Sequence, residues 1–325
     1  MSVIRAIPRG CGHYLPERVV ENAEFEAWVE TSDEWIRART GIERRHFAAE
    51  GEKTSDLGLR AAEAALADAG MAGSDLDALI VATATPDQTF PSTATRIQHA
   101  IGMNRGYAFD IQAVCAGFIY AVANANALIV SGQAERVMVM GAETFSRLMD
   151  WEDRTTSVLF GDGAGALILE RGVGAGVAAD RGVLATELNS DGAHNEILYV
   201  DGGPSTTGTT GHLRMAGKEV FRHAVAKLAE AGASVLEKAG LEKSDVDLVV
   251  PHQANLRIIK KTVETFGIPM EKVVVTVQDH GNTSAASIPI ALSTAKAAGR
   301  VNPGDILLME AIGGGLAWGA AVLRW

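Results

Sequence analysis

The chain repeats itself, and this repetition is the strongest constraint on its fold. Residues 65–81, ALADAGMAGSDLDALIV, resemble residues 235–250, VLEKAGLEKSDVDLVV, with Ser74 opposite Ser244 and Asp75 opposite Asp245. Each segment predicts a helix that ends at a glycine, followed by a polar turn and a short buried strand. Residues 129–141 and 296–310 repeat in the same order. We therefore expect an internal duplication of a unit that mixes helices and strands.

Alternating strands and helices in each copy predict an α/β fold with mostly parallel strands. The second copy is placed after the glycine-rich stretch at residues 171–182, which gives an N-terminal half of residues 1–172 and a C-terminal half of residues 173–325. Helical spacing predicts core faces through Leu59 and Leu66 in one helix and through Phe221 and Leu228 in another. Residues 201–212, rich in Gly, Ser and Thr, predict an exposed loop.

Composition excludes several classes of protein. The formal net charge of the 325 residues is -11, and no run of Lys and Arg is present, which argues against nucleic acid as a partner. The longest apolar stretch, residues 118–130, is interrupted by Asn124 and Asn126 and is too short to span a bilayer. With 47% hydrophobic and 21% charged residues, the chain is typical of a water-soluble globular protein. We expect a cytoplasmic location.

The two cysteines, Cys11 and Cys115, have neither CxxC spacing nor a Cys/His pattern, so no metal site is expected. Cys11 lies in a glycine-flanked turn and is interpreted as a small filler. The Gly-x-Gly-x-Gly run at residues 161–165 precedes an apolar strand instead of following one, which does not fit a dinucleotide-binding fingerprint.

Cys115 lies between a strand-like run and a series of helix formers, DIQAVCAGFIY. A helix N-terminus favours thiolate over thiol, although a buried inert cysteine is the better interpretation on this local context alone. His252 follows a strand that ends at Pro251, and Asn282 follows a further predicted strand. The repeat places Cys115 opposite Asn282. Because the carboxyl ends of parallel strands meet at one crevice, we expect Cys115, His252 and Asn282 to form one site.

Such a set allows acyl transfer. A thiolate can attack an activated carbonyl and hold the acyl group covalently, while neutral His and Asn side chains donate hydrogen bonds to an oxyanion or an enolate. Three glycines, Gly313 to Gly315, follow another predicted strand and can supply a backbone N–H to an oxyanion hole. A plain tight turn explains these glycines equally well.

The motifs taken together resemble those of one known family, the β-ketoacyl-acyl-carrier-protein synthase III enzymes of the thiolase fold. The motifs, in family order over nearly the whole chain, are TSDEWIRARTGIERR, DIQAVCAGF, FGDGAGA, MAGKEVF, VPHQANLRI, HGNTSAASIP and GGGLAWGAAVLRW. The resemblance implies a thiolase-like fold in which two duplicated halves form a five-layered α-β-α-β-α sandwich, and it implies a homodimer.

The resemblance also implies the reaction. Cys115 would accept the acyl group from acetyl-CoA or a similar short primer, and the N–H groups of Cys115 and Gly315 would form the oxyanion hole. His252 and Asn282 would stabilise the enolate formed as malonyl-acyl-carrier protein loses CO2. This decarboxylating Claisen condensation would initiate type II fatty acid synthesis. No cofactor is expected, because acyl-CoA is a substrate.

Further residues are assigned by the same motif matches. Those implied to bind CoA are Thr31, Trp35, Arg39, Arg154, Asn255 and Arg257. Phe90 would reach across the dimer and limit the acyl pocket, favouring a short starter. Departures from the family pattern at Thr155, Lys218 and Ile312 affect the expected CoA contacts and starter choice. For docking an acidic carrier protein we expect a local basic patch, with ordinary solvated charges as the alternative: Arg222, Arg257, Lys260 and Lys261.

Three other functions remain open on the sequence. A related enzyme that condenses or transfers acyl groups in a polyketide or quinolone pathway can keep the same three residues. A non-catalytic acyl-carrier partner of this fold is disfavoured by the presence of Cys115. A cysteine hydrolase would need a His that acts as a base and water in the second step.

Overall fold

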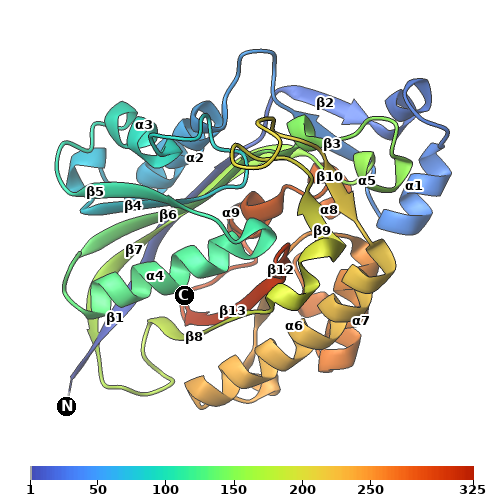
Figure 1. Ribbon diagram of the computed structural model, residues 1–325. Coiled ribbons are helices and arrows are strands. Elements are labelled where there is room, and N and C mark those ends of the chain that lie inside the picture. Colours follow the sequence, from blue (N-terminus) through green and yellow to red (C-terminus); the bar gives the residue numbers. More distant parts are fainter. Residues whose placement is uncertain (1) are drawn as a thin grey trace.

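The computed structural model describes residues 2–325 and contains two main β-sheets of related topology (Figure 1). In the first sheet the strands lie in the order β1-β7-β6-β4-β5. Strand β4 pairs in parallel with β5 and β6, whereas β7 is antiparallel to both β6 and β1. The strands are β1 (Val3–Tyr14), β4 (Ala78–Ala82), β5 (Tyr107–Ile111), β6 (Arg136–Thr144) and β7 (Asp162–Gly174).

The second sheet repeats this order with one strand fewer. Its strands lie in the order β8-β13-β12-β11, so that they take the places of β1, β7, β6 and β4, and this confirms the predicted duplication. The place of β5 holds a single bridge between Val249 and Val273, where a full strand was predicted. The strands are β8 (Gly182–Ser190), β11 (Leu248–Pro251), β12 (Ile306–Gly313) and β13 (Ala317–Arg324).

The expectation of mostly parallel strands is wrong. Parallel pairing joins β4 to β5 and β6, and β11 to β12, but the other neighbours in both sheets are antiparallel. The chain turns directly from β12 into β13 at residues 314–316, and so short a connection permits only an antiparallel neighbour. Each sheet therefore has parallel neighbours on one side and antiparallel neighbours on the other.

Helices form three layers, one between the two sheets and one on the outer face of each sheet, and this gives the expected five-layered sandwich (Figure 1). Helices α2 (Thr54–Ala69) and α3 (Thr93–Ala100) cover the outer face of the first sheet. Helices α4 (Gly117–Val130) and α9 (Ser287–Ala297) lie between the sheets, and α6 (Gly217–Ala239) and α7 (Leu256–Phe266) cover the second. Within residues 2–325, none of the helices combines the length and apolar character needed to cross a bilayer.

The burial of each helix follows from its layer. Helix α4 contacts strands of both sheets and is apolar around most of its circumference, with Phe118, Ile119 and Val122 fully buried. Helix α2 has a solvated face, and its buried stripe runs through Leu57, Ala61 and Ala65. Leu66 belongs to this stripe as expected, whereas Leu59 is only partly buried.

Smaller elements connect the layers. The loop at residues 201–212 joins β9 to β10 and is mostly exposed, as predicted. Strand β7 runs on to Gly174, just past the predicted boundary at residue 172, and that boundary stays a prediction. The remaining strands and α-helices are β2 (Arg18–Glu21), β3 (Arg44–Phe47), β9 (Leu198–Val200), β10 (Leu213–Met215), α1 (Asp33–Thr40), α5 (Arg154–Ser157) and α8 (Val277–His280). The 3-10 helices are η1 (Asn22–Ala27), η2 (Gly73–Asp75), η3 (Val114–Ala116), η4 (Phe145–Leu148), η5 (Gly192–Ile197), η6 (Lys243–Asp245), η7 (Met270–Lys272) and η8 (Ser284–Ala286).

The turns before α4 and α9 have the same form. Val114 begins η3 with φ 47° and Ser284 begins η8 with φ 49°, both in the left-handed region that non-glycine residues rarely adopt. Cys115 and Ala285 each follow such a residue. The structural counterpart of Cys115 is therefore Ala285, and the sequence alignment with Asn282 is wrong. The offset from Cys115 to Ala285, 170 residues, is the same as the offset from Ala65 to Val235 in the first repeated block, and the alignment with Asn282 departs from it.

Each turn contacts a strand of the other half, and the contact requires glycine. A Cβ atom on Gly141 of β6 would collide with the carbonyl oxygen of Ala285. We expect Gly141→Ala to lower the free energy of unfolding by about 2 kcal/mol, because the backbone of η8 must move to admit a methyl group. Urea denaturation measures this change. Gly192→Ala is the matched control, since its Cβ would meet open space, and equal stability of the two variants would contradict the prediction.

Candidate active site

A cavity of about 660 Å³ brings Cys115, His252 and Asn282 together. These three residues come from η3, from the loop after β11 and from the loop between α8 and η8. Each is 5% exposed, so a small opening reaches all three from the cavity. The predicted convergence is found in the structure, although only His252 directly follows a strand and Asn282 follows helix α8.

The local fold places Cys115 at the start of α4. The residue lies within η3, and α4 begins two positions later at Gly117. A Cβ on Gly313 would lie 2.6 Å from the backbone nitrogen of Cys115, so β12 can run this close only with glycine there. Burial raises the pKa of the Cys115 thiol to about 12; the Ser284 hydroxyl lowers this pKa and the Glu143 charge raises it. The resting side chain is therefore a thiol.

His252 is held as a neutral imidazole. Burial lowers the pKa of His252 to about 3. Its Nδ1 lies 2.6 Å from the Ser287 hydroxyl oxygen, which accepts a hydrogen bond of 3.2 Å from the N–H of Gln253. Because the His252 Nδ1 is the only acceptor within reach of the Ser287 hydroxyl hydrogen in the described residues, we assign the hydroxyl as the donor, which gives the tautomer that carries its proton on Nε2. His252 can then donate a hydrogen bond without carrying a charge.

Asn282 is fixed through its carbonyl oxygen. Oδ1 accepts a hydrogen bond of 2.9 Å from the N–H of Ser284, and the N–H of Asn282 donates to the carbonyl of Leu159 at 2.9 Å. This arrangement assigns the orientation of the amide and leaves its NH2 group as a donor. Cys115 is thus accompanied by two neutral donor side chains, the combination that stabilises a developing oxyanion or enolate.

Trp35 lies at the cavity with two guanidinium groups over its ring. The Cζ atoms of Arg39 and Arg154 lie 4.6 Å and 4.7 Å from the ring centroid. Arg154 also donates to the carbonyl of Glu30 at 2.7 Å. Asn255 caps α7 and donates to the carbonyl of Arg39 at 3.3 Å. This part of the cavity is cationic and aromatic, which suits the base and phosphates of a nucleotide.

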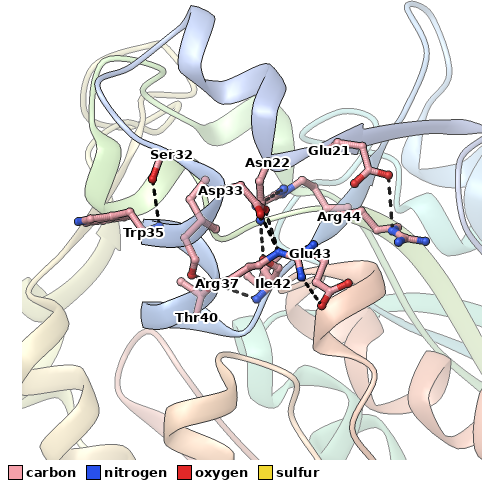
Figure 2. A network of polar contacts seen from close by, with 12 residues as sticks. Glu21, Asn22, Ser32, Asp33, Trp35, Arg37, Thr40, Ile42, Glu43 and Arg44 are labelled. Carbon is pink, nitrogen blue, oxygen red and sulfur yellow. Dashed lines mark hydrogen bonds and ion pairs between the residues drawn. The ribbon is translucent and has the colours of Figure 1, made fainter.

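Polar contacts fix helix α1, which carries Trp35 (Figure 2). Ser32 accepts a hydrogen bond from the N–H of Trp35 at 3.2 Å. Asn22 donates to Asp33 at 2.8 Å and to the carbonyl of Ile42 at 2.7 Å, so it joins both ends of the helix. Behind Asn22, the fully buried guanidinium of Arg45 donates to its Oδ1 at 2.7 Å. The helix that carries Trp35 is therefore held in place by hydrogen bonds at both of its ends.

The other predicted site residues do not all lie at this cavity. Trp35, Arg39, Asn255 and Arg257 border the cavity, whereas Thr31 and Arg154 are not part of its lining. Thr155, Lys218 and Ile312, the positions of departure from the family pattern, do border it. Gly315 lies instead at a neighbouring cavity of about 960 Å³, together with Gly314 and Val114. Phe90 is 81% exposed.

Several lining residues were not identified from the sequence. Phe221 was placed in the core of α6 by its helical spacing, but this part of the helix borders the cavity. Phe160 and Leu213 add to the apolar lining, and periodicity gives no signal that separates them from core residues. Ser284 and Ser287 stand directly behind the three central residues. Cys11 lies within strand β1, opposite Leu167, and not in the expected turn. It is 5% exposed and burial raises its pKa to about 12, in agreement with a filler.

Family models match two parts of the chain. Residues 109–192 match 3-oxoacyl-[acyl-carrier-protein] synthase III, and residues 236–325 match the C-terminal region of the same family. These segments contain Cys115, His252 and Asn282.

Full-length relatives and solved structures give the same result. A β-ketoacyl-[acyl-carrier-protein] synthase III of Cereibacter sphaeroides is 69% identical over 99% of both chains, and that of Ruegeria pomeroyi is 67% identical over 99% of both. The crystal structure of the Aquifex aeolicus 3-oxoacyl-[acyl-carrier-protein] synthase III has a TM-score of 0.92 at 47% identity and covers 98% of this chain and 100% of its own. The chain belongs to the β-ketoacyl-acyl-carrier-protein synthase III family of thiolase-fold condensing enzymes.

Proposed function

We propose that the protein condenses a short acyl-CoA with malonyl-acyl-carrier protein in a decarboxylating reaction that begins type II fatty acid synthesis. The observation that carries this proposal is the meeting of Cys115, His252 and Asn282 at one cavity that also borders Trp35. The names of the relatives agree with it. A priming β-ketosynthase of the R1128 polyketide pathway is similar at only 36% identity, so the polyketide alternative has less support.

In the first half-reaction, the Cys115 thiolate attacks the thioester carbonyl of acyl-CoA, and the CoA thiolate leaves. The start of α4 lies beside the thiolate, and its N-terminal dipole and free N–H groups favour negative charge there. The N–H of Cys115 is the proposed donor to the tetrahedral oxyanion, whereas Gly315, expected as the second donor, borders the neighbouring cavity. The product is an acyl-Cys115 thioester.

In the second half-reaction, malonyl-acyl-carrier protein loses CO2 and its carbanion attacks the acyl-Cys115 carbonyl. The Nε2–H of His252 and the NH2 group of Asn282 donate to the thioester oxygen on which the enolate charge gathers. A neutral donor is suited to this task because it holds the charge without protonating the carbanion. Cys115 then leaves as a thiolate, and 3-oxoacyl-acyl-carrier protein is released.

The CoA moiety is placed along Trp35. We propose that its adenine stacks on the Trp35 ring, with Arg39 and Arg154 near the phosphates and Asn255 and Arg257 along the pantetheine. Thr31 is assigned to the same region through its buried hydroxyl, which has no hydrogen-bond partner within the described residues. Acyl-CoA is a substrate in this scheme, and no cofactor takes part.

A homodimer in the cytoplasm is the proposed working form. Phe90 supports the dimer, because a phenylalanine side chain 81% exposed on a single chain is apolar surface available for a second copy. In a dimer it would limit the acyl pocket of the partner, and this favours acetyl-CoA as the starter.

The basic side chains Arg222, Arg257, Lys260 and Lys261 are the proposed docking surface for acyl-carrier protein. All four are exposed on the neighbouring helices α6 and α7, and Arg257 reaches the cavity. Lys261 also pairs with Glu264 at 3.0 Å. Against a net charge of -11, such a local group of cations is what an acidic partner requires for steering.

Intact-protein mass spectrometry after mixing with acetyl-CoA tests the nucleophile. We expect one acetyl group on the peptide that contains Cys115, because thiolate attack retains the acyl group as a thioester. Cys115→Ala should abolish the adduct, and Cys11→Ala should leave it unchanged. An adduct that persists in Cys115→Ala would assign the nucleophile to another residue.

His252→Ala and Asn282→Ala should separate the two half-reactions. Both variants should still acquire the acetyl group, since their donors act on the enolate. Release of CO2 from malonyl-acyl-carrier protein should fall by about 100-fold or more, the usual effect of removing one oxyanion donor. Radiolabelled CO2 release and acetyl loading are measured on the same samples, and a parallel loss of loading would overturn the assigned roles.

Lys260→Glu should reduce kcat/KM for malonyl-acyl-carrier protein by about 3- to 10-fold at low salt, because like charges then face each other at the rim of the interface. Acetyl loading from CoA should not change. Arg60→Glu, an exposed position on helix α2 against the first sheet, is the matched charge reversal and should have no effect. Equal effects of the two substitutions would show that net charge is responsible.

A further inference from the structure

Arg45 on β3 is the largest side chain that is fully buried in the described part of the chain, and the proposed reaction does not use it. Its Nη1 donates to Asn22 Oδ1 at 2.7 Å and to the carbonyl of Val20 at 3.4 Å. Its Nη2 donates to the carbonyl of Val158 at 2.5 Å, and its Cζ lies 4.3 Å from the ring centroid of Phe25. Burying a cation among neutral groups costs free energy, so packing alone does not explain Arg45.

The first link of Arg45 leads to helix α1. Asn22, whose Oδ1 accepts from Arg45, donates through its NH2 group to Asp33 at the start of the helix and to the carbonyl of Ile42 just past its end (Figure 2). Because both the oxygen and the nitrogen of this amide are engaged, its orientation is fixed. Trp35 lies on the first turn of the same helix. The placement of its ring therefore depends on the contact between Arg45 and Asn22.

The second link of Arg45 leads to helix α5. Val158 directly follows this helix, and its carbonyl accepts from Arg45. The helix begins with Arg154, whose Cζ lies 4.7 Å from the ring centroid of Trp35. The Arg154 guanidinium also donates to the carbonyl of Glu30, in the segment that leads into α1. One buried side chain is thus joined to both of the helices whose residues meet at the Trp35 ring.

Phe25 extends this support to the segments before the two helices. Its ring centroid lies 5.0 Å from that of Trp28 and 6.4 Å from that of Trp151, and these two tryptophan rings are 5.3 Å apart. Trp28 precedes α1 in the chain, and Trp151 precedes α5. The cation–π contact between Arg45 and Phe25 is fully buried, where such contacts are strongest. Arg45 and Phe25 therefore hold the approaches to both helices as well as the helices themselves.

We propose that Arg45 is a positioning residue for CoA, because it holds α1 and α5 at the separation at which Trp35 and Arg154 receive the nucleotide. Arg45 does not border the cavity and does not touch the substrate. It orders the two binding groups before CoA arrives, so that less conformational entropy is lost on binding. A guanidinium suits this task, since its planar fork directs donors to separate acceptors in fixed directions. The inference rests on the proposed placement of CoA along Trp35.

Isothermal titration calorimetry of CoA with the full-length protein tests this role. Arg45→Met removes both links and keeps an unbranched side chain in the space. It should weaken CoA binding by about 10-fold, because Trp35 and Arg154 must then be ordered by the ligand. Arg45→Lys keeps the charge but replaces the fork by a single ammonium, and it should weaken binding by about 3- to 10-fold. This second variant decides the question if Arg45→Met does not fold.

Steady-state kinetics separates a binding effect from a general loss of structure. In Arg45→Met, KM for acetyl-CoA should rise by about 10-fold while kcat changes by less than about 2-fold, the pattern of binding lost equally in ground state and transition state. Leu66→Ala is the matched control, since Leu66 is buried on α2 in a hydrophobic cluster separate from the one that Trp35 packs against. It should lower the free energy of unfolding and leave KM for acetyl-CoA unchanged.

A double-mutant cycle shows whether Arg45 acts through Trp35 and Arg154. The variant Trp35→Ala/Arg154→Ala should bind CoA weakly, and adding Arg45→Met should change Kd by less than about 2-fold further. A full additional loss would show that Arg45 acts elsewhere. Wild-type affinity in Arg45→Met, or in Arg45→Lys where only that variant folds, would show that Arg45 serves the fold alone. Either result overturns the positioning role.

The proposed function has its own outcome in the same experiment. Wild-type affinity for CoA in Trp35→Ala/Arg154→Ala would overturn the placement of CoA along Trp35, and this inference with it. Weak binding in that variant together with unchanged binding in Arg45→Met would leave the placement of CoA intact and overturn only the role of Arg45.

Discussion

The structure depends on a mutual contact between two tight turns and two strands. The turn at η3 contacts β12 of the other half at Gly313, and the turn at η8 contacts β6 at Gly141. Neither turn can form its contact unless both halves are folded and the facing residue lacks a side chain. Cys115 is therefore positioned by the assembly of the two halves, and so are the groups that the second turn directs toward it.

The sequence predicted the duplicated α/β halves and the meeting of Cys115, His252 and Asn282, because strand ends and helix stops leave strong local patterns. It did not predict the antiparallel side of each sheet, which in the second half depends on how β12 and β13 are joined. It also misaligned Cys115, because the pairing with Asn282 departed from the 170-residue offset of the first repeated block; that offset leads to Ala285, the counterpart that the matching backbone angles at Val114 and Ser284 identify. Glu143 and Ser284 gave no signal, since isolated polar residues in buried runs have no periodicity.

The two copies of the duplicated unit contribute different groups to the site. The first turn carries the thiol, and the second has a methyl group at the matching position but supplies Asn282 and Ser284 around it. His252, kept neutral by burial, completes a site whose polar groups are donors without charge. Such a site stabilises negative charge where it appears during reaction while leaving the resting cavity largely apolar.

The two guanidinium groups over Trp35 have a consequence for ligand exchange. Wherever a guanidinium covers the ring face that a flat base would take, the base must first displace it, so part of the stacking energy replaces an interaction that is already present. The displaced arginine is then free to meet a phosphate of the same ligand. When the ligand leaves, the arginine can cover the ring again. The arginine therefore competes with the base for the ring face, and this favours rapid exchange of the ligand over tight binding.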